Sequence, residues 1–350
     1  MLARGHKVDA VAPGLFEDRA TFDALTGMGV GCHTVPLSRT GLNPVADLGT
    51  LFALRRLMRQ LGPDVVISYT IKPVIWGTLA AAWAGVSNRI GLITGLGYAF
   101  TGEARGKRRL IQMAARQLYR FALSRATLVF FQNGDDRQLF SDLRLLSPAT
   151  PSAVVNGSGI DTVAFPMTDL PKTPLRFLMI ARLLGDKGVR EYAAAAAHIK
   201  EQYPQVKCDL VGGLDSNPDS ITATEVQAWC TAGCLNWLGE MGDVRPAIAR
   251  CHVFVLPSYR EGTPRTVLEA MAMGRAIITT NAPGCRETTV QGDNGFLVPI
   301  ADALALVDAM KQFVIHPELA PRMGQSSRRR AEKKYDVHQV NGQMLSAIGL

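Results

Sequence analysis

The chain has 350 residues, of which 47% are hydrophobic and 19% charged, a composition that excludes disordered and fibrous proteins and allows two domains of ordinary size. It contains no apolar run of about 18 residues or more and starts without the apolar core of a signal peptide, so we expect a cytoplasmic protein. The net charge of +8 favours an anionic partner, which can be a phosphorylated substrate, a lipid surface or a nucleic acid.

The six cysteines do not form a recognisable metal or redox motif. Cys208 and Cys251 lie in strand-like runs, where they are expected to be small core residues. Cys230 and Cys234 have neither zinc nor redox spacing. We therefore predict no disulfide and no metal site.

The first half of the chain alternates between helical and strand-like segments, which predicts an α/β domain. Its start, residues 2–13, has the pattern of a last helical turn, a glycine cap at Gly5 and a strand. The later segments are helices at 18–28 and 45–61, extended segments at 31–36, 65–68 and 90–98, and a strand at 128–131 followed by a capped helix.

Two of these strands lead into loops with candidate ligand-binding residues. The strand at 65–68 continues through Tyr69 and Lys72 to an alanine-rich helix expected at 78–84, and an ordinary surface lysine explains Lys72 equally well. The strand at 90–98 runs into a Gly95-x-Gly97 turn. This turn lacks the third glycine that a dinucleotide-binding fingerprint requires, so the sequence does not predict that motif.

The segment from Arg105 to Arg125 is a basic amphipathic helix. Its cations alternate with leucine, isoleucine, methionine, tyrosine and phenylalanine. Such a helix can lie on an anionic lipid surface. It can equally pack on a sheet with a solvated basic edge, and the two interpretations are compatible.

The second half begins after a polar, proline-bearing linker at 166–174. A strand at 176–182 ends at Arg182, and Lys187 stands just before a helix at 189–200. The carboxyl edge of an open α/β sheet is where ligands bind, and both cation types bind phosphate. In isolation such a pair is more often an ordinary surface feature.

The segment from Ser258 to Gly274 is the most informative of the chain. It follows a buried strand at 252–256, with Thr263 as the expected N-cap of a helix, Pro264 as its first residue and Gly274 as its left-handed C-terminal cap. The N–H groups of residues 262–266 would form an anion site of the kind that holds a diphosphate.

Two glutamates flank this expected anion site. Glu261 stands just ahead of the helix and Glu269 lies within it. A carboxylate beside an anion site is repelled unless hydroxyl groups donate to it, and sugars supply such hydroxyls. The plainer interpretation is a solvated loop acid and a surface helix acid.

The two glutamates, separated by seven residues, resemble the EX7E motif of retaining GT-B glycosyltransferases of family 4. The turn "NGSGID" at 156–161 is similar to the one that closes the first domain in this family. The resemblance implies an α/β GT-B fold, with two Rossmann-like domains whose parallel sheets face a central cleft. It places the first domain at 1–165, the linker at 166–174, the nucleotide-sugar domain at 175–334 and a C-terminal helix at 335–350 that crosses back to the first domain.

Family members normally place one more strand, a glycine-containing loop and most of a helix ahead of the first strand seen here. The resemblance therefore implies that about one βα unit is missing, roughly 25 to 30 residues. The start codon would then be wrongly placed, or the chain would be a fragment.

The resemblance also assigns roles to residues. Glu261, Arg182 and Lys187 would be catalytic, with the two cations stabilising the leaving nucleotide diphosphate, Glu261 holding sugar hydroxyls and Glu269 accepting from the ribose. Glu191 would belong to the donor-phosphate segment with Arg182 and Lys187, or would only orient Lys187. The backbone near 239–241 would contact the base of the donor. The full donor-binding set is Arg182, Lys187, Glu191, Gly239, Met241, Glu261, Gly262, Thr263, Pro264, Arg265, Thr266, Val267 and Glu269; the acceptor-side set is Tyr69, Lys72, Thr94, Gly95 and Tyr98.

The activity implied is transfer of a sugar, an N-acetylhexosamine, from a UDP-sugar to a saccharide on undecaprenyl diphosphate during cell-surface polysaccharide biosynthesis. No metal or other cofactor is expected, and the enzyme would be peripheral on the inner face of the bacterial cytoplasmic membrane. A GT-B sugar-nucleotide epimerase would share the fold and the donor. A basic nucleic-acid-binding protein is suggested only by the charge, because the chain lacks any helix-turn-helix, zinc or stacking motif.

Overall fold

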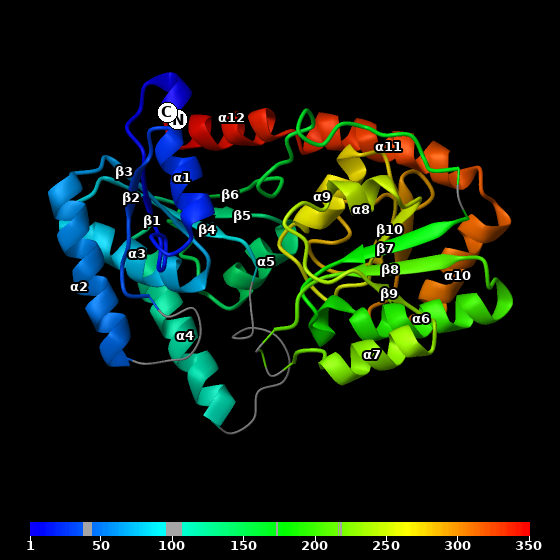
Figure 1. Cartoon of the computed structure of the whole chain (residues 1–350). Helices are drawn as coiled ribbons and strands as arrows, with labels where there is room; N and C mark the ends of the chain where they lie inside the picture. The colour runs from blue at the N-terminus through cyan, green and yellow to red at the C-terminus, as the bar shows by residue number, and fades with distance from the viewer. Residues whose placement is uncertain (38–43, 96–106, 173, 216, 218) are drawn as a thin grey trace. The chain divides into compact units, whose positions relative to one another are not determined.

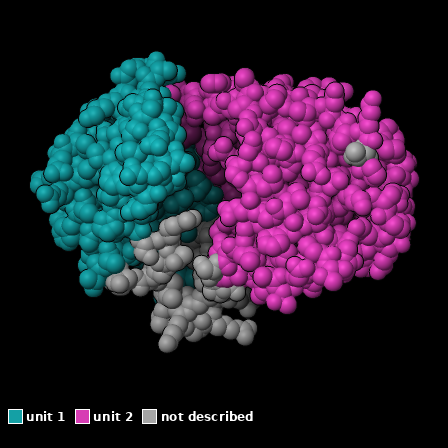
Figure 2. All heavy atoms as spheres, viewed as in Figure 1, with its two compact units in different colours: residues 1–130, 140–153 teal, residues 131–139, 154–350 magenta. Residues whose placement is uncertain are grey.

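The computed structural model describes residues 1–350 except 38–43, 96–106, 173, 216 and 218 (Figure 1). The chain divides into two compact units, the first made of residues 1–130 and 140–153 and the second of residues 131–139 and 154–350 (Figure 2). None of the helices in the described part of the chain is both long enough and apolar enough to cross a membrane.

The elements up to residue 154 alternate between strands and helices, as expected. They form a two-stranded parallel sheet, β1-β2, and a separate four-stranded sheet of order β3-β4-β5-β6, with α3 packed against β3 and β4. In chain order they are η1 (Leu2–Arg4), β1 (Asp9–Val11), α1 (Arg19–Gly27), β2 (Gly31–His33), α2 (Pro44–Leu61), β3 (Val65–Tyr69), α3 (Ile71–Ala84), β4 (Asn88–Ile93), α4 (Lys107–Leu123), β5 (Leu128–Phe131), α5 (Gly134–Asp142) and β6 (Ser152–Val154).

The start of the chain has the predicted turn, cap and strand, with Gly5 at φ 80° after η1. The helix predicted at 78–84 is longer than expected, because α3 already begins at Ile71. Pro73 lies in its first turn, where the missing N–H costs no helical hydrogen bond. Lys72 therefore lies on a helix and not in a loop.

The second unit is built on one six-stranded sheet of order β12-β11-β10-β7-β8-β9, in which every neighbouring pair is parallel. Figure 1 shows α6 and α7 on one face and α8, α9 and α11 on the other. The elements are β7 (Arg176–Ile180), η2 (Gly185–Lys187), α6 (Val189–Gln202), β8 (Lys207–Val211), α7 (Ala223–Thr231), β9 (Asn236–Trp237), α8 (Arg245–Ala249), β10 (Val253–Leu256), α9 (Arg265–Ala272), β11 (Ala276–Thr280), β12 (Gly295–Val298), α10 (Ala303–Ile315), α11 (Leu319–Lys334) and α12 (Val337–Ala347).

The strand order of the second unit creates a switch point between β7 and β10. The chain proceeds from β7 outward to β8 and β9, and then returns to the other side of β7 with β10, β11 and β12. All four residues of β10 are buried, as its continuous apolar sequence predicts. In open α/β sheets, ligands bind beyond the carboxyl ends of the strands at such a switch point.

The linker segment is held to the second unit by a buried arginine. The guanidinium of Arg275, which is fully buried, donates to the carbonyl oxygens of Thr168 at 2.8 Å and Ile248 at 2.9 Å, and also to those of Ala249 and Met273. Because a buried guanidinium needs acceptors for its donors, these bonds fix the linker to α8 and to the turn before β11. The last helix, α12, is counted with the second unit; its return to the first domain stays a prediction.

Candidate active site

The loops that follow β7 and β10 meet at the switch point. The N–H of Tyr259, after β10, donates to the carbonyl oxygen of Asp186, after β7, at 2.8 Å. Gly188, at φ 75°, lies so close to Pro257 that a Cβ there would stand 2.2 Å from its carbonyl oxygen. Only glycine fits both the left-handed conformation and this close approach, so Gly188 sets the separation of the two loops.

Lys187 and Glu261, which are 74 positions apart in the sequence, form an ion pair across these loops. Lys187 Nζ lies 2.6 Å from Glu261 Oε1, and the two side chains are 14% and 18% exposed. The hydroxyl of Ser258 lies 2.8 Å from the same carboxylate oxygen. A half-buried ammonium therefore stands directly beside a carboxylate with a fixed orientation.

The backbone of Glu261 is fixed from a third loop, after β11. Its N–H donates to the carbonyl oxygen of Pro283 at 3.0 Å. Gly284, at φ 82°, would place a Cβ only 2.1 Å from the Glu261 carbonyl oxygen. The position of the Glu261 loop thus depends on a glycine that the sequence analysis did not single out.

Residues 132–136, predicted only to cap a helix, also hold this loop. Asn133 caps α5 by accepting from the Asp136 N–H at 2.7 Å, and its Nδ2 donates to the carbonyl oxygens of Gly262 at 2.9 Å and Glu261 at 3.3 Å. Arg260 Nε lies 3.1 Å from the carboxylate of Asp136. The sequence signal for this contact is weak, because an Asn-Gly-Asp-Asp run after a strand is accounted for by helix capping alone.

The side chain of Asp136 is buried as it pairs with Arg260. Burial raises the pKa of this carboxyl, and the hydrogen bond with Arg260 acts in the opposite direction. The pair ties residues 131–139 to the Glu261 loop, which agrees with the grouping of both segments in one compact unit.

Helix α9 begins one residue later than predicted. Pro264, and not Thr263, is the N-cap, and Arg265 is the first helical residue. Thr263 cannot cap the helix because its hydroxyl donates to the Gln132 carbonyl oxygen at 3.1 Å, while its N–H donates to Gln132 Oε1 at 3.1 Å. The predicted end is confirmed, with Gly274 at φ 78°.

The predicted anion site at this helix start is smaller than expected. The N–H of Val267 donates to the Pro264 carbonyl oxygen at 3.1 Å, and that of Thr263 is also engaged. The N–H groups of Arg265 and Thr266 have no backbone acceptor in the described part of the chain. Two adjacent donors at the positive end of α9 are thus available to an anion.

Glu269 lies on the buried side of α9 and is 7% exposed. Burial raises the pKa of its carboxyl, while the hydrogen bond from Arg265 Nε, 3.0 Å from Oε1, acts in the opposite direction. The surface-acid interpretation of Glu269 is therefore wrong. A buried carboxylate with one exposed arginine partner has acceptor capacity left for a ligand hydroxyl.

Arg182 and Glu191 are less closely tied to this pair than predicted. Arg182 lies 3.3 Å from Asp215 Oδ2, and its side chain is 64% exposed. Glu191 accepts from the hydroxyl of Tyr259 at 2.8 Å. Among the described residues no ion pair joins Glu191 to Lys187, and the role of Glu191 at the donor stays a prediction.

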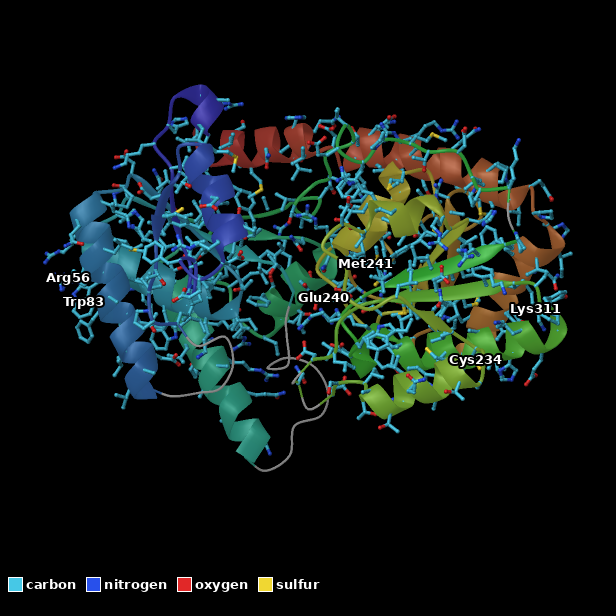
Figure 3. The ribbon with its side chains drawn as sticks, in the orientation of Figure 1. Arg56, Trp83, Cys234, Glu240, Met241 and Lys311 are labelled. Atoms are coloured by element: carbon cyan, nitrogen blue, oxygen red, sulfur yellow. The ribbon has the colours of Figure 1, made fainter. Side chains whose placement is uncertain are left out.

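The segment expected to contact the donor base lies at the carboxyl end of β8. The Gly212 N–H donates to the Gly239 carbonyl oxygen at 2.8 Å, and a Cβ at Gly213 would stand 2.7 Å from a carboxylate oxygen of Glu240. Figure 3 labels Glu240 and Met241 at this end of the sheet. The segment thus shares an edge with the Lys187 and Glu261 loops, although its role stays a prediction.

The acceptor-side residues belong to the first unit. Lys72 Nζ lies 3.0 Å from Asp47 Oδ1 in a little-exposed ion pair, so the expectation of a plain surface lysine is wrong. Tyr69 is 48% exposed at the end of β3, and Thr94 follows β4. Gly95 is described at φ 136°, while Tyr98 lies outside the described residues.

Comparison with protein families covers both units. Residues 163–330 match the family described as Glycosyl transferases group 1, and residues 1–157 match the Glycosyl transferase 4-like domain. The chain is 31% identical to the N,N'-diacetylbacillosaminyl-diphospho-undecaprenol alpha-1,3-N-acetylgalactosaminyltransferase of Campylobacter jejuni, over 77% of this chain and 73% of that protein. The chain belongs to the family 4 glycosyltransferases.

Two further relatives are also named as bacterial glycosyltransferases. The UDP-Gal:alpha-D-GlcNAc-diphosphoundecaprenol alpha-1,3-galactosyltransferase of Escherichia coli is 24% identical over 79% of this chain and 73% of its own length. The capsular polysaccharide biosynthesis glycosyltransferase CapM of Staphylococcus aureus is 23% identical over 87% of this chain and 80% of its own length.

Solved structures show the GT-B fold of the enzyme. Sucrose-phosphate synthase from Thermosynechococcus elongatus superposes with a TM-score of 0.78 at 18% identity, covering 98% of both chains. Anabaena HepE in complex with UDP gives a TM-score of 0.76 at 17% identity, covering 98% of this chain and 99% of that one. These likenesses confirm the predicted α/β fold.

Proposed function

We propose that this glycosyltransferase moves an N-acetylhexosamine, with retention of configuration, from a UDP-sugar to a saccharide on undecaprenyl diphosphate in cell-surface polysaccharide biosynthesis. The names of the Campylobacter jejuni and Escherichia coli relatives support a diphospho-undecaprenol acceptor, and the first of them supports the sugar. Both relatives are named as alpha-1,3 transferases. Since UDP-hexoses carry the sugar as the α anomer, an α product means retention.

The observation that carries the proposal is the pairing of Lys187 with Glu261 at the switch point, at 2.6 Å. In a nucleotide-sugar, the bond that breaks joins a phosphate to a sugar ring. A cation is needed to balance the charge of the phosphate, and a hydrogen-bond acceptor is needed to hold the hydroxyls of the sugar. An ammonium and a carboxylate in contact match the two sides of that bond. The free N–H groups of Arg265 and Thr266 would add donors for the diphosphate.

The step we propose breaks the bond between C1 and the phosphate oxygen, and the electron pair stays on the departing UDP. The acceptor hydroxyl oxygen bonds C1 from the same face, and its proton passes to the donor phosphate. Lys187 and Arg182 neutralise the charge that develops on the diphosphate, Glu261 holds the sugar hydroxyls and Glu269 holds the ribose. No metal is required in this scheme, so turnover should persist in EDTA.

We also propose a peripheral position on an anionic membrane surface, through α4. The exposed residues of α4 in the described part of the chain include two cations and two large apolar side chains, Arg109, Met113, Arg120 and Phe121, together with Ala114 and Gln117. The guanidinium of Arg125 lies 5.2 Å from the ring centre of Phe121. Apolar side chains flanked by cations are the pattern of a helix that lies on a lipid surface.

The first test is thermal protection of the purified chain by UDP, GDP, ADP and NAD. A ligand present at about a hundred times its Kd stabilises the folded protein by about 2.7 kcal/mol. We expect selective protection by UDP. Equal protection by GDP or ADP would contradict the proposed donor.

The decisive test is product analysis with UDP-N-acetylgalactosamine, UDP-N-acetylglucosamine and UDP-galactose, each with and without a synthetic undecaprenyl-diphosphate-linked monosaccharide. We expect one N-acetylhexosamine to be added to the lipid, with α geometry in the proton NMR spectrum of the product. A β linkage would refute retention. A change of the UDP-sugar itself in the absence of acceptor would instead identify a sugar-nucleotide epimerase.

A further inference from the structure

The second unit contains a hollow of about 490 Å³ that the proposed reaction does not use. Its lining residues come from the C-terminal half of α11, the turn after β6, the turn before β12, and α12. Its size falls in the range of small-molecule sites, roughly 300 to 1,000 Å³. It is lined by Asn156, Asp293, Ser326, Arg329, Arg330, Lys333, Lys334 and Gln343.

The charge of this lining is strongly positive, with four cations and one acid. In the described part of the chain, none of the four cations forms an ion pair with a carboxylate. Arg328, one position earlier on the same helix, differs in this respect, because its Nε lies 2.6 Å from Glu332 Oε1. The four cations of the hollow thus outnumber its one acid, Asp293, and in the described part of the chain none of them is paired along the helix as Arg328 is.

Neutral oxygens hold three of the four cations in place. Arg330 and Lys334 donate to the carbonyl oxygen of Glu287, at 2.9 and 3.1 Å, and Arg329 donates to Ser326 Oγ at 2.9 Å. The Nε of Arg330 is buried and has no hydrogen-bond partner among the residues that the structure describes. These contacts orient the positive groups without neutralising them.

Stabilisation of a helix end explains only part of this arrangement. Lys333 and Lys334 lie in the last turn of α11, where cations interact favourably with the helix dipole. Arg329 and Arg330 lie one turn earlier, beyond the reach of that effect. The convergence of Asn156 and Gln343 from other segments onto the same hollow is also left unexplained.

We propose that this hollow binds a phosphate group, carried either by a lipid headgroup or by a soluble phosphate. Arginine offers paired donors to phosphate oxygens and lysine a compact charge, while the side-chain amides of Asn156 and Gln343 add neutral donors. Burial, followed by the nearby Arg330, lowers the pKa of Lys334, while Glu287 acts in the opposite direction.

The site is separate from the proposed donor site but shares a structural segment with it. The donor residues lie in the loops after β7 and β10, whereas the hollow is formed mainly by α11. The turn at residues 283–287 joins the two regions. Gly284 packs on the Glu261 carbonyl, and the carbonyl oxygen of Glu287 accepts from Arg330 and Lys334.

The test uses the full chain with the double substitution Arg329→Gln and Lys333→Gln. Both side chains are exposed, and glutamine keeps the helix propensity. The matched control also removes one arginine and one lysine, by Arg250→Gln just after α8 and Lys311→Gln on α10. Figure 3 labels Lys311. Equal unfolding temperatures of the two variants without ligand would establish that both are folded.

Two probes distinguish the sources of the phosphate. The first is cosedimentation with vesicles of phosphatidylglycerol and phosphatidylcholine, against vesicles of phosphatidylcholine alone. The second is calorimetric titration with inorganic phosphate. We expect the hollow variant to bind one of these probes roughly 10- to 30-fold more weakly than the wild type and the control, the loss expected for two cations near an anion.

The results of the two binding experiments identify the source of the phosphate. A selective loss of binding to anionic vesicles supports a lipid headgroup, and a selective loss of phosphate binding supports a soluble ligand. Lipid binding by α4 would be common to all three proteins and does not affect the comparison. Equal binding by the wild type, the control and the hollow variant in both experiments would overturn the proposal.

Discussion

At the scale of single residues, the proposed active site contains a half-buried ion pair whose two members have different proposed partners. Lys187 and Glu261 are in contact at 2.6 Å. Removing one member of a buried pair leaves the other with an uncompensated charge, which costs more than the pair itself contributes. A substitution at either position is therefore expected to alter both the charge and the local geometry.

Replacement of Lys187 by alanine tests its proposed role at the leaving diphosphate. We expect kcat to fall by roughly 100- to 1,000-fold, the usual cost of removing one group that stabilises developing charge. The measurement is the steady-state rate with saturating UDP-sugar, with Lys311→Ala as a control for loss of a lysine from the same unit. A Lys187→Ala enzyme with the turnover of the wild type would refute the mechanism.

Replacement of Glu269 by glutamine tests the proposed contact with the ribose. Glutamine has nearly the same shape but accepts a weaker hydrogen bond than a carboxylate, so we expect the KM for the UDP-sugar to rise about 10-fold. The effect on kcat should be smaller, because the ribose does not change during the reaction. An unchanged KM with a lower kcat would show that Glu269 acts at the reacting centre instead.

At the scale of elements, local sequence patterns predicted much of the second unit. The buried strand β10 and the glycine end of α9 follow from short-range signals, an apolar run and a Gly274 at φ 78°. The start of α9 was wrong by one residue because the backbone and hydroxyl of Thr263 bind Gln132, which is 131 positions away. Helix and capping propensities depend only on neighbouring residues, so they cannot predict a contact over this distance.

Sequence patterns were likewise unable to predict most of the contacts that hold the Glu261 loop in place. The cap that Asn133 forms on α5 is a local interaction and could be predicted, whereas its bond to Gly262 joins residues 129 positions apart. Pairing of Lys187 with Glu261 is also long-range, yet both residues follow neighbouring parallel strands, whose carboxyl ends share one edge. Long-range contacts were predictable where sheet topology imposes them.

Replacement of Asn133 by serine separates its two functions. Serine keeps the helix cap but removes the donor to the Glu261 and Gly262 carbonyl oxygens. Leaving buried acceptors unsatisfied costs about 1 to 3 kcal/mol of stability, and we expect kcat to fall about 10-fold because the Glu261 loop is released.

The control for this substitution is Asp302→Ala, which removes the cap of α10, where the Asp302 side chain accepts from the Ala305 N–H at 2.9 Å. The Asp302→Ala substitution should cost about 1 kcal/mol of stability, at a position away from the Glu261 loop. If both variants lose stability but neither loses turnover, Asn133 has only a structural role.

At the scale of the whole molecule, buried titratable groups make the stability of the second unit depend on pH. His252, the residue just before β10, is 9% exposed. Its Nδ1 accepts from the Arg176 N–H at 3.2 Å, and its Nε2 lies 3.0 Å from the carbonyl oxygen of Pro171 in the linker. The neutral imidazole satisfies both contacts, whereas protonation of Nδ1 would break the first one.

This arrangement predicts acid destabilisation. Burial is the main cause that lowers the pKa of His252 below its ordinary value of 6.5, so the unfolded chain binds the proton more readily than the folded one. The stabilisation is complete above that value and is lost as the pH falls through the lower folded pKa, at up to about 1.4 kcal/mol per pH unit. Buried carboxyls with raised pKa, such as Glu269, act with the opposite sign, so a comparison with a variant is required.

The variant is His252→Gln, which cannot titrate but can still accept and donate. The free energy of unfolding would be measured in urea between about pH 7.5 and pH 5.5 for both proteins. We expect the wild type to lose stability more steeply than the variant on the acid side, and the two curves to run parallel at the upper end of the range. Parallel curves throughout would mean that His252 does not change its protonation on unfolding, and that other groups account for any pH dependence of the second unit.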